Sequence, residues 1–100
     1  MQFYPLERLM NLHDGYQRAF RVAGHSLLLV QDEGRCYLMV NQCPHQLRPL
    51  DQATVGKGTI RCPYHGIEFT LATGQSDGGC PNGLRLLQAA YEGNTVGVYM

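Results

Sequence analysis

NQCPHQLRPLDQATVGKGTIRCPYHGIEFT, residues 41–70, contains two short loops of the same chemical design. Residues 43–45 read CPH and residues 62–66 read CPYHG. Each loop offers one thiol and one imidazole, and sixteen residues separate His45 from Cys62. No other part of the sequence places metal-binding side chains so close together.

The side chains of the two loops are soft or borderline donors. Cys thiolate and His imidazole suit zinc, copper or the iron of iron–sulfur clusters, and they are poor ligands for magnesium or calcium. Pro44 and Pro63 follow the cysteines, and each fixes φ and removes a backbone donor at that point. Gly66 allows a tight turn or a close backbone approach. The pattern therefore predicts one metal site, formed by Cys43, His45, Cys62 and His65.

Two kinds of site fit this ligand count. A structural zinc ion would take two Cys and two His in a tetrahedron. Zinc ligands more often occur as a Cys-x-x-Cys pair with a His pair, whereas each loop here is mixed. The other site is a [2Fe–2S] cluster with two Cys on one iron and two His on the other, which is the arrangement of a Rieske centre.

The resemblance extends beyond ligand spacing. A C-x-H loop is followed by P-L, then by C-P-x-H-G-x-x-F and a T-G turn. In this chain the pattern falls on residues 43–45, Pro49, Leu50, residues 62–66, Phe69, Thr73 and Gly74. It resembles the Rieske [2Fe–2S] ferredoxin family, tightly over the cluster region and loosely over the flanking strands.

That resemblance implies a role for each ligand. Cys43 and Cys62 would bind the inner iron, and His45 and His65 would bind the outer iron near the surface. Neutral His ligands in place of two thiolates make such a site less negative, so its potential lies higher than that of all-Cys clusters, at about −150 to +300 mV.

The first loop departs from the family pattern. The family commonly has a small residue soon after the first His, where this chain has Gln46, Leu47 and Arg48. Rieske proteins of respiratory complexes also join their two loops by a disulfide, and the corresponding positions here are Arg48 and Tyr64. We therefore expect the soluble ferredoxin type, with a potential in the lower part of the range. Of these four residues, which are the candidates for partner contact, Arg48 is favoured because it is charged and close to an exposed ligand.

Bulk properties exclude several classes of protein. One hundred residues predict a single small domain, residues 1–100. The formal net charge is zero, so a nucleic-acid or anionic-membrane partner is not expected. No apolar run reaches the length of a membrane span, and no signal peptide is visible. These features predict a cytoplasmic protein, with a monomer as the default.

The remaining two cysteines and two histidines are expected to lie outside the metal site. Cys36 lies in an apolar run and is predicted to be a buried strand thiol. Cys80 lies in a Gly-rich loop, and a disulfide with Cys36 is not expected in a reducing cytoplasm. His13 and His25 are predicted to be solvated histidines in turns.

Alternation of apolar and polar residues predicts strands through most of the chain, with no helix of ordinary length. A three-strand meander should lead into the first loop, short strands should flank the second, and a hairpin should end the chain. Residues 6–12 suggest one or two helical turns, and residues 51–58 a polar connector. The predicted strands cover residues 16–23, 26–31, 35–41, 59–61, 67–71, 84–91 and 95–100.

The predicted fold class is therefore all-β. We expect a small antiparallel sandwich or barrel, with a cluster-binding subdomain at about residues 41–71. Residues 75–83 resemble the loop that covers the cluster in the Rieske family, although a plain connector between strands would have the same composition.

Function follows from the expected cluster and from what the chain lacks. An oxygenase would need a mononuclear iron held by two His and a carboxylate, and only His13 and His25 remain for it. No Gly-x-Gly-x-x-Gly dinucleotide site is present. The sequence predicts a one-electron carrier between a flavin-dependent reductase and a terminal oxygenase, such as one acting on aromatic rings.

Three alternatives remain open at this stage. The chain could be the small subunit of an assimilatory nitrite reductase, held by the large subunit. It could be a domain-scale subunit of another oxidoreductase, or a zinc-stabilised binding module without a redox role.

Overall fold

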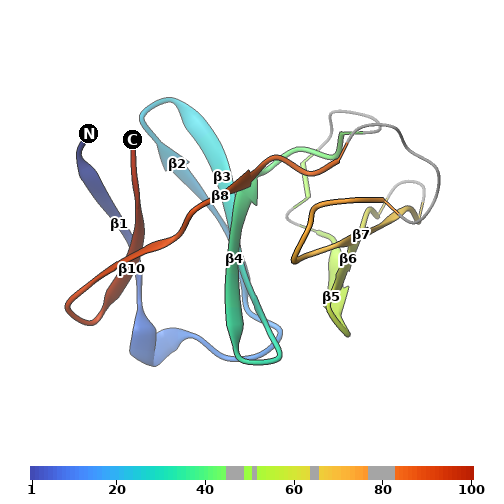
Figure 1. Ribbon diagram of the computed structural model, residues 1–100, viewed down its shortest axis with the longest axis horizontal. Coiled ribbons are helices and arrows are strands. Elements are labelled where there is room, and N and C mark those ends of the chain that lie inside the picture. The colour runs from blue at the N-terminus through green and yellow to red at the C-terminus, as the bar shows by residue number, and fades with distance from the viewer. Residues whose placement is uncertain (45–48, 51, 64–65, 77–82) are drawn as a thin grey trace.

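Three antiparallel sheets make up the part of the chain that this computed structural model describes, residues 1–44, 49–50, 52–63, 66–76 and 83–100 (Figure 1). Sheet A has the order β1-β10-β9, sheet B the order β2-β3-β4-β8, and sheet C the order β5-β6-β7. The strands are β1 (Phe3–Arg8), β2 (Gln17–Val22), β3 (His25–Asp32), β4 (Arg35–Val40), β5 (Thr54–Gly56), β6 (Thr59–Arg61), β7 (Glu68–Thr70), β8 (Leu86–Leu87), β9 (Ala90–Glu92) and β10 (Thr95–Tyr99).

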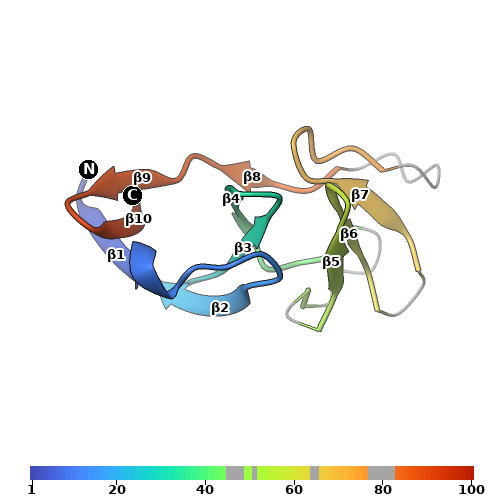
Figure 2. The same ribbon diagram turned by 90° about the horizontal axis from the view of Figure 1, so that it is seen from below.

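The sheets follow one another along the long axis of the molecule, with sheet A at one end, sheet B in the middle and sheet C at the other end (Figures 1 and 2). Both termini lie at the sheet A end. There Gln2 and Met100 exchange two backbone hydrogen bonds, of 3.0 and 3.1 Å. The two predicted metal-binding loops follow β4 and β6, which belong to the middle sheet and the far sheet.

Sheet B is buried on both of its faces, because it lies between two apolar cores. Leu27 and Leu29 point into the core shared with sheet A, together with Val96 and Val98 of β10. Leu28 and Val30, the alternating residues of the same strand, point into a second core that contains Ile60 and Phe69 of sheet C. A strand covered on both sides should be a continuous apolar run, as residues 27–30 are.

The predicted meander is confirmed, with β2, β3 and β4 paired in sequence order. Its two hairpins, and the β5–β6 hairpin, share one kind of two-residue turn. In each turn a non-glycine residue and a following glycine both have positive φ: Ala23 and Gly24, Glu33 and Gly34, Lys57 and Gly58. This backbone suits the right-handed twist of the flanking strands, and the glycine lowers its cost. His25 therefore lies on β3 and not in the turn, although it is exposed as expected.

The predicted helical turns at residues 6–12 are largely wrong. Strand β1 continues to Arg8, where Glu7 and Arg8 pair with Val96 and Thr95 of β10. Only Leu9–Asn11 forms a single 3-10 turn. The register shifts between Pro5 and Glu7, as at a β-bulge, so strict alternation is broken within this strand.

Two further predictions need correction. The supposed connector at residues 51–58 contains strand β5, because the positive φ values at Lys57 and Gly58 let residues 54–56 fold back onto β6. The single strand expected at residues 84–91 is divided between two sheets. Strand β8 pairs with β4 in sheet B, and after two residues β9 pairs with β10 in sheet A.

The predicted all-β fold class is confirmed, since the described residues contain strands, turns and one 3-10 turn but no α-helix. None of those residues belongs to a helix that could cross a membrane. The division of the single domain at about residues 41–71 stays a prediction.

Candidate metal centre

Asn41 and Gln42 separate Cys43 from the end of β4, and Cys43 is completely buried. The preceding Asn41 holds the chain at this point. Its backbone N–H donates to Ser26 O at 2.9 Å, and its side-chain Oδ1 accepts from the backbone N–H of Leu50 at 2.7 Å. Asn41 and Leu50 therefore close the two ends of the first loop. This role of Asn41 was not predicted from the sequence, although an Asn at the end of a strand is a common partner for a nearby backbone N–H.

Cys62 follows β6 directly, and only 1% of its surface is exposed. Its backbone N–H donates to Ile67 O at 2.9 Å, and its backbone O accepts from the N–H of Gly66 at 3.0 Å. These two bonds close the second loop at its base. Gly66 has φ of +67°, so the tight turn expected at this glycine is present.

Both cysteines belong to one cluster of buried residues, the core between sheets B and C. Their neighbours there include Leu50, Ile60 and Phe69. Two thiols in one apolar core, each at the start of a closed loop, suit a metal site held by two thiolates, since a soft metal in an apolar site favours sulfur ligands. The chemistry of this donor set fits iron or zinc.

The other two predicted ligands, His45 and His65, lie outside the described residues, as do Gln46, Leu47, Arg48 and Tyr64. Within the described ranges no group of three or more metal-binding side chains occurs. The structure therefore brings Cys43 and Cys62 into one core, and the contribution of the histidines stays a prediction.

Two side chains of sheet B connect it to the segment between the loops. Asp32, at the end of β3, accepts a 2.6 Å hydrogen bond at Oδ2 from the backbone N–H of Gly58. Gln17, at the start of β2, donates from Nε2 to Ala53 O at 2.9 Å. Sheet C and the segment that leads into it from the first loop are therefore held against sheet B by these two hydrogen bonds as well as by the apolar core.

The predicted covering loop at residues 75–83 is closed at its base, while residues 77–82 lie outside the described ranges. The backbone N–H of Leu84 donates to Gly74 O at 2.7 Å, and Thr70 donates to Gln75 O at 2.8 Å. A Cβ atom added to Gly83 would lie 2.7 Å from Gly74 O. This close approach explains why a glycine is suited to position 83.

The comparison with protein families decides the identity of the chain. The family model of the Rieske [2Fe-2S] domain matches residues 2–86. The chain belongs to the Rieske [2Fe-2S] domain family. Membership implies a [2Fe–2S] cluster as its cofactor, which agrees with the donor set above.

Curated relatives of this Rieske domain are much longer proteins. Apoptosis-inducing factor 3 of Homo sapiens is 34% identical over 64 residues, which cover 64% of this chain and 11% of the relative. The oxygenase component of chloroacetanilide N-alkylformylase of Rhizorhabdus wittichii is 40% identical over 50 residues, 49% of this chain and 14% of the relative. The chain thus spans only about a tenth of the length of these relatives.

Solved structures match over almost the whole chain. The ferredoxin of carbazole 1,9a-dioxygenase from Nocardioides aromaticivorans IC177 has a TM-score of 0.86 at 26% identity, covering 98% of this chain and 97% of its own. A ferredoxin of Sphingomonas yanoikuyae B1 has a TM-score of 0.88 at 22% identity, covering 99% of both chains. A putative nitrite reductase small subunit has a TM-score of 0.79 at 19% identity and covers 100% of both.

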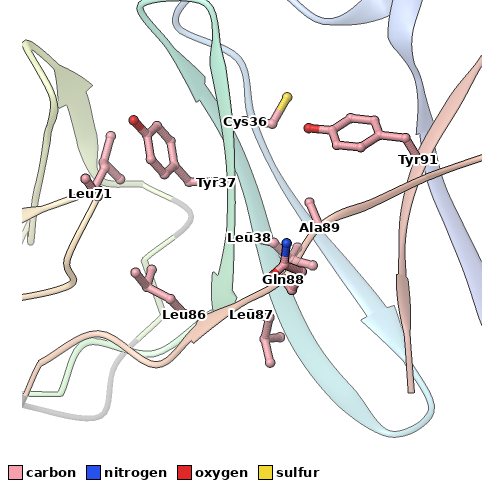
Figure 3. Close-up of a pocket in the computed structure, with 10 residues that line it drawn as sticks. Cys36, Tyr37, Leu38, Leu71, Leu86, Leu87, Gln88, Ala89 and Tyr91 are labelled. Carbon is pink, nitrogen blue, oxygen red and sulfur yellow. The ribbon is translucent and has the colours of Figure 1, made fainter. Parts of the chain in front are cut away.

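Cys36 of this Rieske domain lies apart from the two buried cysteines. It packs against the other core, between sheets A and B, and it lines a pocket of about 280 Å³ with Tyr37 and Tyr91 (Figure 3). Burial raises the pKa of the Cys36 thiol, and a hydrogen bond with Tyr91 offsets this only in part. A neutral thiol is a poor metal ligand. The predicted strand position of Cys36 is confirmed, with the side chain half-buried, and Cys80 lies outside the described residues.

Proposed function

We propose that this Rieske domain is a one-electron carrier that passes electrons from a flavin-dependent reductase to a terminal oxygenase. In this proposal Cys43 and Cys62 bind the inner iron, and His45 and His65 bind the outer iron. A cluster of this kind supplies transfer of one electron at a time.

The observation that carries the proposal is the match to the carbazole dioxygenase ferredoxin. That match covers 98% of this chain and 97% of the ferredoxin, so the two folds correspond from end to end. The longer relatives contain the same domain type within a tenth or so of their length. Correspondence with a ferredoxin of a dioxygenase system therefore supports electron transfer as the task of this domain.

The described residues suit that task. Cys43 and Cys62 are buried, so water is excluded around the sulfur atoms that would bind the inner iron. The hydrogen bonds at Asn41, Cys62 and Gly66 close both loops, which limits movement of the ligands when their charge changes. The histidines, as the ligands expected near the surface, would be the route for an electron to a docked partner.

The oxygenase partner is supported by complexes of related fold. Structures of the carbazole 1,9a-dioxygenase system contain oxygenase and ferredoxin together, and the match to one such complex has a TM-score of 0.83 over 93% of this chain. We further propose a cytoplasmic monomer, as suits a carrier that visits two partners.

A second candidate function is that of a nitrite reductase small subunit. The specific observation is the putative nitrite reductase small subunit whose structure corresponds over 100% of both chains. In that case the domain would remain bound to a large subunit. A third candidate is a role as a domain-scale subunit of another oxidoreductase, because one of the longer relatives is the oxygenase component of chloroacetanilide N-alkylformylase.

An electron paramagnetic resonance spectrum of the dithionite-reduced protein tests the cofactor. Iron, sulfide and zinc are assayed on the same sample. Mixed His/Cys ligation predicts a rhombic signal with an average g below that of all-Cys clusters, at two irons and two sulfides per chain. A silent spectrum with one zinc per chain would overturn the carrier proposal and leave a zinc-stabilised binding module.

Partner identity needs a separate measurement. The reduced protein is mixed, in stopped-flow experiments, with an oxygenase component of an aromatic-ring dioxygenase or with a nitrite reductase large subunit. Rapid reoxidation by the oxygenase alone supports the proposal. Stable binding to the large subunit, with slow transfer to the oxygenase, would establish the second candidate instead.

A further inference from the structure

The guanidinium group of Arg61 lies against Gly66, at the base of the second loop. A Cβ atom added to Gly66 would lie 3.0 Å from one terminal nitrogen of Arg61 and 3.2 Å from its Nε. Arg61 therefore occupies the space that a side chain at position 66 would fill. The absence of a side chain at Gly66 is what allows the cation to approach the loop backbone this closely.

This position is next to two proposed cluster ligands. Arg61 directly precedes Cys62, and Gly66 directly follows His65. The bonds between Cys62 and Gly66 and between Cys62 and Ile67 hold the two ends of the loop together. The guanidinium group that rests on Gly66 therefore lies at the base of the loop that carries two of the proposed ligands.

The charge of Arg61 is not neutralised within the described part of the chain. Its side chain is exposed. Glu68 is the cross-strand neighbour of Arg61 in the β6–β7 register, but the two side chains form no ion pair within 4.0 Å. The ion pair found among the described residues joins Arg18 to Glu7. The loop base therefore carries a fixed positive charge.

We propose that Arg61 raises the reduction potential of the cluster by placing this charge beside the second loop. The inference rests on the proposed cluster ligation. Reduction adds one negative charge to the cluster, and a nearby cation stabilises the reduced form more than the oxidised form. Two unit charges roughly 10 Å apart, in surroundings between water and a protein surface, attract with an energy equivalent to about a two- to fifteen-fold change in an equilibrium constant, which sets the scale of the expected effect.

The test compares midpoint potentials of purified, cluster-loaded variants. Arg61→Gln and Arg61→Met remove the charge, whereas Arg61→Lys keeps the charge but lacks the planar guanidinium group. Arg8→Gln removes a charge from an exposed side chain of β1 in sheet A, at the opposite end of the molecule from sheet C (Figure 1), and serves as the matched control. The spectrum of each reduced variant is recorded to confirm that the ligands are unchanged.

Both uncharged variants should have a more negative midpoint potential, equivalent to about a two- to fifteen-fold loss in the equilibrium constant for reduction. The midpoint potentials of the Lys variant and of the Arg8→Gln control should stay close to that of the parent protein. Equal potentials in all forms would overturn the inference while leaving the carrier proposal intact.

Two other outcomes also overturn it. If the midpoint potential of Arg61→Lys falls as far as that of Arg61→Gln, the guanidinium group acts through packing and not through charge. If neither uncharged variant retains the cluster while the Lys variant does, Arg61 has a structural role only. A parent protein without a [2Fe–2S] cluster would instead remove the proposed function on which the inference rests.

Discussion

The carboxylate of Asp32 and the backbone N–H of Gly58 are joined by a 2.6 Å hydrogen bond across 26 residues of sequence. Asp32 ends β3 in the middle sheet, and Gly58 lies in the turn between β5 and β6 of sheet C. Only 8% of Asp32 is exposed. A buried carboxylate that accepts from a backbone N–H makes a charge-assisted bond, so this contact is a specific anchor between the two sheets.

Asp32→Ala should destabilise the protein, because it leaves the N–H of Gly58 without its acceptor. We expect the free energy of unfolding to fall by about 1–3 kcal/mol. Asp32→Asn keeps an oxygen acceptor and should lose less. Denaturant unfolding followed by circular dichroism measures both, with Glu33→Gln at the neighbouring exposed position as the control for lost charge. Equal stability of the Ala variant and the parent would show that the bond contributes nothing.

The three described cysteines should differ sharply in their effect on the cluster. Cys43→Ala and Cys62→Ala each remove a proposed thiolate ligand from the core between sheets B and C. Both should be purified without stoichiometric iron and sulfide. Cys36→Ala removes a half-buried thiol from the other core and should retain two irons per chain. Iron analysis and visible absorption check this, and a colourless Cys36 variant would contradict the assignment.

Stability should fall at alkaline pH through Tyr16. Its pKa is raised from 10.0 to about 12, first by burial and then by its 2.8 Å hydrogen bond to Glu7 Oε2. Because the folded pKa lies above the unfolded one, this stabilisation is complete below about pH 10 and is lost as pH rises toward 12. Tyr16→Phe should remove this part of the pH dependence.

The measurement for Tyr16 is the free energy of unfolding between pH 8 and roughly pH 12, which spans both pKa values. Tyr4→Phe, at a half-buried position that packs on the same core, is the control. A loss of slope in Tyr16→Phe beyond that in Tyr4→Phe is then assigned to the contact of Tyr16 with Glu7. Identical slopes for the parent and Tyr16→Phe would show that the phenol does not couple to folding.

Gly83→Ala should open the base of the loop at residues 75–83. The added methyl group would lie 2.7 Å from Gly74 O, and the bond from Leu84 to Gly74 would have to shift. If this loop covers the cluster, water and oxygen gain access, so bleaching in air should become faster by several-fold. Gly56→Ala is the matched control, because a Cβ atom there meets nothing within 4 Å. Equal bleaching rates in the two variants would argue against a covering role.

The sequence by itself determined the family and the fold class, and it singled out the two cysteines that the structure buries in one core. The spacing of residues 43–45 and 62–66 is local, and the chemistry of thiol and imidazole does not depend on the rest of the fold. The three-strand meander also followed from local alternation and from glycines in its turns, which act over a few residues. For the same reason Gly66 was correctly expected in a tight turn.

Only the tertiary structure decided which segments share a core and which contacts close the loops. The β-bulge in β1, the β5 strand and the division between β8 and β9 all depend on pairing with strands distant in sequence. The bonds from Asn41 to Leu50 and from Asp32 to Gly58 likewise join residues that a local pattern cannot bring together. The contact of Arg61 with Gly66 is of the same kind, because a guanidinium group can fill the space above a glycine only after the loop has closed.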